Sequence, residues 1–381
     1  MIRIHQGYVS DSDGMSTLST DIDINDKKTN VYVSVENEYG KFLSPERADY
    51  ALVGLLAYAI RRGHDIICEA PVTEELLYNI REFLIPTLCH TDSRAYPVKI
   101  QADIAPPLDK LPVSKVMHGG VGTGLSFGVD SSYAILKHVD TEYPNQNLTH
   151  LCIFNNGSGI ISNPIRRRKI FARAEKISQE FNLPILKVDS NVRSFIKQHH
   201  AAVHTYKDAL IIWAMQKLWR VYYYGSTYSF ANFSLIGNTR RDPAHFEPFL
   251  LDCFSTSKLR IISSGSEGDR DDKVAFIVDN PLVQKYLHVC TGKTVNCGKC
   301  GKCLRTLLAI DALGKLDKFR EAFDIDAYIE QREEAYRDLH ESIKRNPEHP
   351  FLAQTCKILR ERHKDFFDSL DAEEKLDAEE K

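Results

Sequence analysis

The feature that most constrains this chain is a run of small residues that ends a strand-like segment and begins a helical one. Glycines recur through Gly119–Gly124 and are followed by Ser126-Phe-Gly-Val-Asp-Ser-Ser132, after which a helical pattern continues to His138. A turn of this kind directs unpaired N–H groups and the positive end of the helix dipole at one point, where phosphate or pyrophosphate binds. We expect an anion site here, with Asp130 as a ligand for Mg²⁺. The alternative is a glycine-rich turn that binds nothing.

Two commoner nucleotide motifs are excluded by their spacing. In a Walker A loop that ended at Gly292-Lys-Thr294, the first glycine would fall on Leu287. The dinucleotide pattern G-x-G-x-x-G fails as well, because its third glycine would fall on Leu125 or Phe127. The anion site is therefore of another kind.

The composition is that of an ordinary soluble protein of about two or three domains, with 43% apolar and 27% charged residues. A net charge of −3 disfavours a protein built mainly to bind nucleic acid. No apolar run approaches the ~18 residues of a membrane span, and Met1–His5 does not resemble a signal peptide. Nine cysteines, four of them within residues 290–303, do not suit a disulfide framework. We expect a cytoplasmic protein without membrane partners.

Residues 1–112 are expected to form a separate α+β unit, which we interpret as a docking surface for a partner or substrate. Its strand patterns alternate apolar and polar residues, and Ala105-Pro-Pro-Leu-Asp109 breaks the pattern before the next domain. The expected strands are residues 1–8, 30–36, 66–69 and 96–104, and the expected helices are 48–61 and 76–84.

Strand and helix patterns alternate from residue 113, which predicts an α/β domain over residues 113–310 with a parallel sheet and helices on both faces. Ligands of such sheets bind beyond the carboxyl ends of the strands, so we expect the loops at 126–132, 155–159 and 263–273 to converge. The further strands expected are residues 148–154, 183–189, 228–234 and 259–263, and the expected helices are 131–138, 166–181 and 204–224.

Four cysteines form the second strong motif, Cys290-(x6)-Cys297-Gly-Lys-Cys300-Gly-Lys-Cys303. Thiolates at C-x2-C spacing turn around one ion, and four of them make a closed, tetrahedral Zn²⁺ site. Because no coordination position is left for water, we expect a structural site whose binding energy helps to fold a loop-rich segment. An iron–sulfur cluster is the alternative. A redox-active C-x-x-C pair explains four interleaved thiols less well.

The glycine-rich loop resembles the pyrophosphate loop (PP-loop) of the ATP pyrophosphatases, whose usual form is Ser-Gly-Gly-x-Asp-Ser-Ser/Thr, with Phe127 in place of the first loop glycine. Together with four cysteines that end C-G-x-C-x-x-C, it resembles the QueC-like (ExsB) family, related to 7-cyano-7-deazaguanine synthase, over residues 120–310. That family often carries an arginine three positions after the last cysteine, where this chain has Thr306 beside Arg305. Residues 311–381, expected to be a helical extension with a fraying acidic tail, lie outside the resemblance, as do residues 1–112.

The resemblance implies an adenine nucleotide alpha hydrolase-like fold and an ATP-dependent, AMP-forming enzyme that uses Mg²⁺. It activates a carboxylate, expected to be 7-carboxy-7-deazaguanine, and an amine then displaces AMP. We expect a protein's terminal amine, as proposed for QueC-like proteins of bacterial antiphage systems, because an added N-terminal unit suits a large second substrate. The site residues implied are Ser126, Phe127, Gly128, Val129, Asp130, Ser131, Ser132, Phe154 and Asn155 for ATP, Asp130, Ser131, Arg270 and Lys273 for catalysis, and Cys290, Cys297, Cys300 and Cys303 for Zn²⁺.

Three other functions stay open. With ammonia as the amine, the chain would be a nitrile-forming 7-cyano-7-deazaguanine synthase. A PP-loop tRNA sulfurtransferase is disfavoured by the acidic net charge, and because four clustered cysteines suit a metal better than a catalytic thiol. From a different class, a non-catalytic module would bind a nucleotide without turnover, and Phe127 is the feature that favours it.

The alternative role of Arg270 and Lys273 is a surface ion-pair patch with the neighbouring aspartates.

Overall fold

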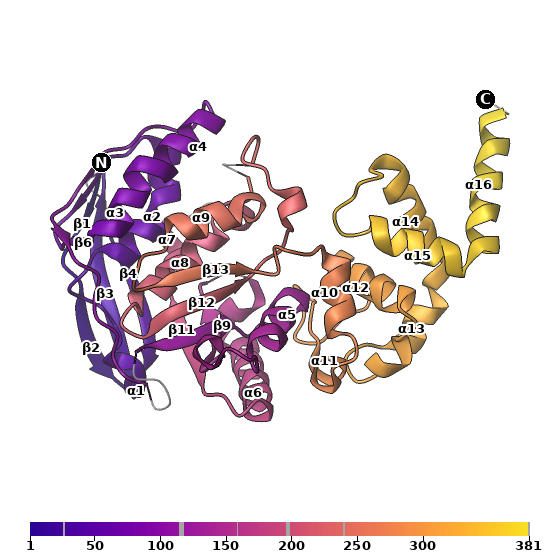
Figure 1. Ribbon diagram of the computed structural model, residues 1–381, viewed down its shortest axis with the longest axis horizontal. Coiled ribbons are helices and arrows are strands. Elements are labelled where there is room, and N and C mark those ends of the chain that lie inside the picture. The colour runs from indigo at the N-terminus through magenta and orange to yellow at the C-terminus, as the bar shows by residue number, and fades with distance from the viewer. Residues whose placement is uncertain (26, 114–117, 158, 196–198, 239–240, 380–381) are drawn as a thin grey trace. The chain divides into compact units, whose positions relative to one another are not determined.

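The computed structural model describes residues 1–25, 27–113, 118–157, 159–195, 199–238 and 241–379. The chain divides into two compact units (Figure 1). We call the first the sheet unit; it consists of Met1–Leu125, Ala134–Thr227 and Phe233–Ser266. We call the second the helical unit; it consists of Ser126–Tyr133, Tyr228–Asn232 and Glu267–Lys381.

In the described part of the sheet unit, eleven strands form one mixed, mostly parallel sheet in the order β13-β12-β9-β10-β11-β4-β3-β1-β5-β7, with β2 paired to β3. Two further strands, β6 and β8, pair with each other in parallel. The strands are β1 Ile2–Ile4, β2 Tyr8–Ser12, β3 Met15–Ile24, β4 Lys27–Glu36, β5 Ile66–Cys68, β6 Val72–Thr73, β7 Ile100–Gln101, β8 Ile104–Ala105, β9 Gly120–Gly124, β10 His150–Asn155, β11 Ile185–Ser190, β12 Trp219–Gly225 and β13 Arg260–Ser264.

One half of the sheet, β13-β12-β9-β10-β11, is parallel throughout. The chain moves outward from β9 through β10 to β11 and then returns to β12 on the other side of β9, so the strand order reverses between β9 and β12. In open α/β sheets this reversal point is where ligands bind beyond the carboxyl ends of the strands. The PP-loop sequence directly follows β9, as expected.

The N-terminal strands continue the same sheet. β4 pairs antiparallel with β11, with Ser34 opposite Asp189, and the Ser190 hydroxyl donates to the Tyr32 carbonyl at 2.6 Å. The boundary expected at residue 112 therefore falls inside the sheet unit. Strand β3, which the sequence analysis did not identify, pairs with β4 along its whole length.

Helices cover the sheet of this unit, and their apolar residues form its core (Figure 1). Helix α2 packs against α8. The two helices can approach closely because α2 has a glycine at position 54, where a Cβ atom would lie only 2.3 Å from Leu210 Cδ1. The helices of the sheet unit are α1 Asn37–Gly40, α2 Asp49–Arg62, α3 Glu74–Asn79, α4 Ile85–Thr91, α6 Pro164–Glu180, α7 Val192–Phe195, α8 His204–Ala214 and α9 Glu247–Cys253, and α5, Val129–His138, begins in the helical unit and ends in the sheet unit.

Two expected elements of residues 148–263 are wrong, and of the strand expected over 96–104 only Ile100–Gln101 is extended in the sheet. The helix expected over 204–224 ends at Ala214, and the aromatic and β-branched run Trp219–Gly225 forms strand β12, because such side chains fit a pleated surface between neighbouring strands. The strand expected over 228–234 is absent from the described structure, which has a short 3₁₀ turn at Phe230–Asn232. The other expected strands and helices of residues 148–263 are confirmed within a few residues.

The helical unit contains α10 and the helices that follow it, and the helical C-terminus is confirmed. Its interior includes Asp311, whose Oδ2 accepts hydrogen bonds from the Tyr328 and Tyr336 hydroxyls at 3.1 and 2.7 Å. The boundary expected at residue 310 falls inside α12, and the acidic tail is helical to Glu379. The helices are α10 Arg270–Ile277, α11 Pro281–Tyr286, α12 Gly301–Ala312, α13 Ile325–Glu330, α14 Arg332–Arg345, α15 Ala353–Arg362 and α16 Lys364–Glu379. Across the described residues, we find no helix whose length and apolar character would let it cross a bilayer.

Candidate anion site and metal centre

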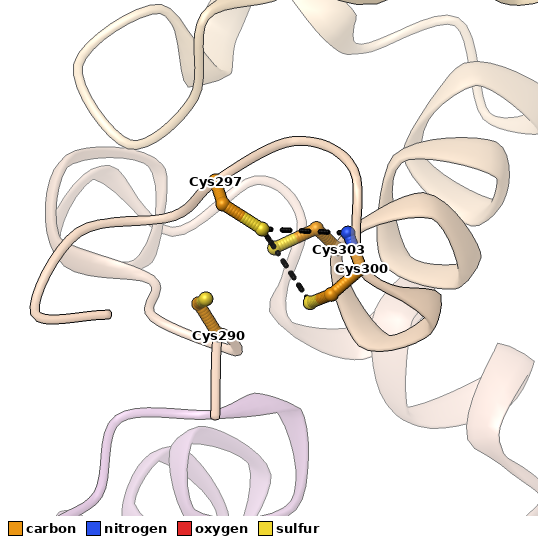
Figure 2. Close-up of side chains that lie close together, drawn as sticks. All are labelled: Cys290, Cys297, Cys300 and Cys303. Atoms are coloured by element: carbon orange, nitrogen blue, oxygen red, sulfur yellow. Dashed lines mark hydrogen bonds between the residues drawn. The ribbon is translucent and has the colours of Figure 1, made fainter. Parts of the chain in front are cut away.

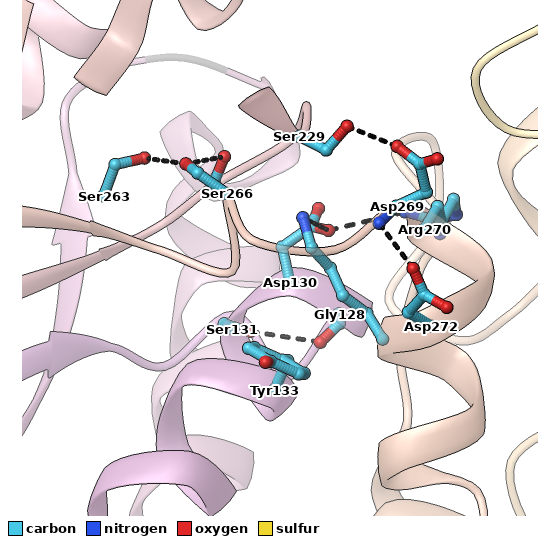
Figure 3. Close-up of polar contacts among 12 residues, drawn as sticks. Gly128, Asp130, Ser131, Tyr133, Ser229, Ser263, Ser266, Asp269, Arg270 and Asp272 are labelled. Atoms are coloured by element: carbon cyan, nitrogen blue, oxygen red, sulfur yellow. Dashed lines mark hydrogen bonds and ion pairs between the residues drawn. The ribbon is translucent and has the colours of Figure 1, made fainter. Parts of the chain in front are cut away.

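The PP-loop sequence forms a tight turn that leads into α5. The Ser126 hydroxyl accepts a hydrogen bond from the Gly128 N–H at 3.3 Å and lies 2.8 Å from the Ser131 hydroxyl. Ser131 in turn donates to the Gly128 carbonyl at 3.3 Å (Figure 3). Ser126 is exposed, whereas Ser132 is fully buried and its hydroxyl has no hydrogen-bond partner among the described residues. Val129 is also buried, so the loop presents Ser126 and its backbone to solvent.

Phe127 combines an unfavourable backbone conformation with a buried side chain. Its φ is 55°, in the left-handed region that L-residues avoid, as expected for a residue that occupies a glycine position. Its ring is 1% exposed and packs edge-on against Tyr286, with ring centroids 6.5 Å apart. The Phe127 carbonyl accepts a hydrogen bond from the His288 N–H at 2.9 Å. The ring therefore anchors the loop in the core of the helical unit.

Asp130, in the first turn of α5, lies beside two cations from α10. Its Oδ1 is 3.7 Å from Arg270 Nη1 (Figure 3). The same oxygen is 3.8 Å from Lys273 Nζ. Arg270 and Lys273 are 6% and 1% exposed, whereas the side chain of Asp130 is 26% exposed. Asp130, Arg270 and Lys273, three of the residues expected for catalysis, thus lie together within one unit. Because Arg270 and Lys273 are buried, they do not form a surface patch.

The neighbouring aspartates have a different task. Asp269 and Asp272 form a capping box at the start of α10, with the Asp269 N–H donating to Asp272 Oδ2 at 2.8 Å. The Ser229 hydroxyl donates to Asp269 (Figure 3). Tyr133 donates to Glu267 at 2.6 Å and so ties the first turn of α5 to the segment before α10. These contacts fix the turn that carries Arg270 and Lys273.

Helix α12 adds two cations that the sequence analysis did not assign, Lys302 and Arg305. Partial desolvation lowers the pKa of Lys302. The positive charges of Arg270 and Arg305 lower it further, whereas the negative charge of Asp130 raises it. Burial likewise lowers the pKa of Arg305 to about 10, with Arg270 acting in the same direction and Asp130 against it. Both side chains therefore belong to the electrostatic environment of Asp130. We call Arg270, Lys273, Lys302 and Arg305 the cation cluster.

The cation cluster runs from the interior to the surface. Arg270 and Lys273 are buried, Arg305 is half-buried and Lys302 is exposed. The guanidinium of Arg305 lies 4.6 Å from the centroid of the Phe351 ring, and its Nε has no hydrogen-bond partner in the described part of the chain. The position expected for the family arginine holds Thr306, which accepts a hydrogen bond from Arg270 at 3.2 Å. A signal was available in the sequence, since residues 302, 305 and 306 share one helix face.

The four expected cysteines cluster, with their sulfur atoms all within 4.8 Å of one another (Figure 2). Cys303 Sγ lies 3.9 Å from Cys297 Sγ and 3.5 Å from Cys300 Sγ. Tetrahedral Zn²⁺ with Zn–S bonds of about 2.3 Å requires S–S separations of about 3.8 Å, so the cluster fits that ion closely. Backbone N–H groups of Lys299 and Cys300 lower the pKa of the Cys297 thiol to about 6, which favours a thiolate. All nine cysteines are free thiols.

A side chain that the sequence analysis missed, Asn296, shapes the loop between Cys290 and Cys297. The Asn296 amide accepts hydrogen bonds from the Val289 and Cys290 N–H groups and donates to the Leu287 and Ala322 carbonyls at 2.8 Å. Cys300 is the N-cap residue of α12, the helix that carries Lys302 and Arg305. The cysteine cluster therefore fixes the start of the helix that supplies half of the cation cluster.

The remaining expected ATP ligands, Phe154 and Asn155, lie in the sheet unit. Phe154 is half-buried and stacks on Tyr222 with centroids 6.0 Å apart. The Asn155 side chain donates to Asp189 and accepts from the Gly157 N–H at 3.2 Å. Both side chains therefore interact with other residues of the sheet unit.

Comparison with protein-family models, curated protein sequences and solved structures found no match for this chain. What the fold and site themselves define is an α/β protein with a large mixed, mostly parallel sheet, flanking helices, a helical C-terminus and a four-cysteine cluster that suits a metal ion.

Proposed function

We propose that this protein is a PP-loop ligase that transfers AMP from ATP to a carboxylate and then joins the acyl group to an amine. The observation that carries the proposal is the cation cluster beside Asp130 at the first turn of α5. Four cationic side chains gather near Asp130, and although Asp271 also acts on Arg270, a local excess of positive charge remains. The expected substrate, 7-carboxy-7-deazaguanine, and the expected amine, a protein terminus, come from the resemblance of the loop and cysteine motifs.

The charge excess selects the ligand. Removing a charged side chain from water costs several kcal/mol unless a partner compensates it. Within hydrogen-bond reach of a helix N-terminus, a compensating group with three or four negative charges is a triphosphate or a pyrophosphate. The exposed Lys302 and the buried Lys273 at opposite ends of the cluster give such a group a continuous series of contacts from solvent inward.

The proposed reaction has two steps. A carboxylate oxygen of the substrate attacks the α-phosphorus of ATP, the bond from that phosphorus to the β-phosphate oxygen breaks, and pyrophosphate leaves with the negative charge. The amine nitrogen then attacks the acyl carbon, AMP leaves and the nitrogen loses a proton. The cation cluster and the loop N–H groups stabilise the charge that develops on the leaving pyrophosphate.

Asp130 is the residue that fits Mg²⁺. Its Oδ1 is buried and has no hydrogen-bond partner among the described residues, which leaves it available as an oxygen ligand. Bound with the nucleotide, Mg²⁺ would neutralise phosphate charge and orient the phosphates for in-line attack. The hydroxyls of Ser126 and Ser131 are placed beside the same turn to donate to phosphate oxygens.

The test is release of pyrophosphate from ATP and Mg²⁺ with and without 7-carboxy-7-deazaguanine. We compare the wild type with Asp130→Asn and Arg305→Gln, and use Arg320→Gln as the matched control, because Arg320 lies in the same unit but pairs with Asp317 and Asp326 at the surface. In the wild type we expect pyrophosphate release that requires the deazaguanine. The rate of release should fall by about 10²–10³-fold in both site variants and should be unchanged in the control variant.

Other outcomes of this experiment contradict the proposal and identify its alternatives. ATP binding without pyrophosphate release, whatever the carboxylate, would indicate a non-catalytic nucleotide-binding module. Release that requires tRNA in place of the carboxylate would indicate a sulfurtransferase. Where release does depend on the deazaguanine, mass analysis of the product separates a nitrile, formed with ammonia, from a protein conjugate.

A further inference from the structure

A polar network lies at the carboxyl ends of strands β10 and β12 in the sheet unit, apart from the residues of the proposed reaction. The Asn156 amide, directly after β10, donates to Asp208 Oδ1 at 2.7 Å, and the Tyr224 hydroxyl, in β12, donates to Asp208 Oδ2 at 3.2 Å. His204 lies 3.3 Å from the Tyr224 hydroxyl and 3.2 Å from Asp242. Asp208, Tyr224 and His204 are only partly buried, so the network reaches the surface.

Lys207, which precedes Asp208 in α8, is the exceptional residue. Its side chain is fully buried, and its Nζ has no hydrogen-bond partner among the described residues. Burial lowers the pKa of Lys207 to about 8, with Arg193 acting in the same direction and Asp208 against it. A buried ammonium group without hydrogen bonds is strongly destabilising, so a protein that keeps one has a use for it.

The surroundings of Lys207 favour an anion. Lys207 is in the first turns of α8, a helix of 11 residues whose N-cap, Val203, provides no side-chain cap. Side chains of a helix lean towards its N-terminus, so the ammonium group and the positive end of the helix dipole act at the same place. Arg193 contributes a second cation from the adjacent α7, where its Nη1 donates to the Gly157 carbonyl at 3.2 Å.

The local charges limit the ligand to a monoanion. Two cations, Lys207 and Arg193, stand against one carboxylate, Asp208, which leaves an excess of about one positive charge. A polyphosphate would be under-compensated here, whereas one carboxylate would balance the charge. Asp208 already accepts two hydrogen bonds from the protein and, as a carboxylate, has lone pairs for further donors of a ligand.

We propose that the N-terminus of α8, with Lys207 and Arg193, binds the carboxylate group of a small organic molecule. Asp208, Tyr224 and His204 are then the polar groups that select the rest of that molecule. The site lies entirely in the sheet unit, and the inference stands whether or not the nucleotide chemistry proposed above is correct.

The test uses acetate as the probe and the full-length protein. Tm is measured in sodium acetate, sodium chloride and sodium phosphate at equal ionic strength for the wild type, Lys207→Met and Lys187→Met. Lys187 is the matched control, because it lies in the same unit but pairs with Glu36 and Glu175. In the wild type we expect acetate, at about tenfold its Kd, to raise Tm by roughly 2–4 °C over chloride.

In Lys207→Met this acetate shift should disappear, while Tm in chloride should rise because the uncompensated charge is gone. Any shift produced by phosphate through the cation cluster of the helical unit should persist in that variant, and Lys187→Met should respond to acetate as the wild type does. An equal acetate shift in the wild type and in Lys207→Met, or no acetate shift in the wild type, would overturn the proposal. Should Lys207→Met not fold, Arg193→Gln replaces it: a smaller acetate shift supports the site and an unchanged one refutes it.

Discussion

Replacing Phe127 with glycine or alanine gives a sharp test of how the loop at residues 126–132 is held in place. Removal of a fully buried phenylalanine ring costs about 3–5 kcal/mol, and the Phe127 ring is 1% exposed. Its φ of 55° costs a side-chain-bearing residue about 1–2 kcal/mol, which glycine does not lose. Glycine instead loses about 0.5–1 kcal/mol more backbone entropy than alanine on folding.

The two substitutions should therefore rank in an unusual order. Phe127→Ala should destabilise the helical unit by about 3–5 kcal/mol, and Phe127→Gly should be equally stable or up to about 1.5 kcal/mol more stable than the alanine variant. At Phe319, which is also 1% exposed but lies in a 3₁₀ turn, the ordinary order should hold, with glycine below alanine.

Urea unfolding followed by two signals measures this ranking. Both tryptophans, Trp213 and Trp219, belong to the sheet unit, so their fluorescence reports that unit, whereas far-UV circular dichroism reports both units. The substitutions at Phe127 should move the dichroism transition, and the ranking is taken from that signal. The reasoning is refuted if Phe127→Gly is less stable than Phe127→Ala by the margin seen at Phe319.

Two further predictions concern the metal and the pH. Chelation should remove one Zn²⁺ per chain and weaken hydrogen-exchange protection at the start of α12, because Cys300 caps that helix; unchanged protection in the metal-free protein would count against a structural role. Burial lowers the pKa of His150 to about 4, below its ordinary 6.5, so protonation opposes folding and stability is lost as pH falls from 6.5 towards 4. Between pH 7 and 4.5 the loss should be about 2–3 kcal/mol, and His150→Phe should lack this part of it; equal losses in urea titrations of both proteins would contradict this assignment.

The sequence predicted elements whose signals are local. The amphipathic pattern of α6, the strands β10 and β13 and the apolar helix α2 appear within a few residues of their expected positions, because periodicity of side chains within one segment is enough to specify them. Prediction from the sequence failed where a helix and the strand that follows it have similar compositions. Residues 204–224 are rich in apolar and aromatic side chains from end to end, and pairing with the partner strands β9 and β13 decides that Trp219–Gly225 is extended.

The candidate site shows the same division. The turn at Ser126–Ser132 and the cysteine spacing were readable, because a turn and a chelate ring are formed by residues close in sequence. Lys302 and Arg305 were not assigned, because an isolated helical cation is normally solvated, and its role depends on which carboxylate packs near it. Asn296 was missed for a similar reason, since its amide forms hydrogen bonds with backbone carbonyl and N–H groups up to 26 residues away along the chain.

By itself, then, the sequence determined the α/β alternation and the spacing of the four clustered cysteines, and it predicted an anion site at the turn 126–132; all of these depend on short-range geometry. Tertiary structure alone decided that the N-terminal strands continue the main sheet through the pairing of β4 with β11, that four cations gather near Asp130, and that Lys207 is buried without a hydrogen-bond partner among the described residues. Those outcomes depend on pairing and burial between residues distant along the chain, where the free energy of one contact depends on every other contact around it.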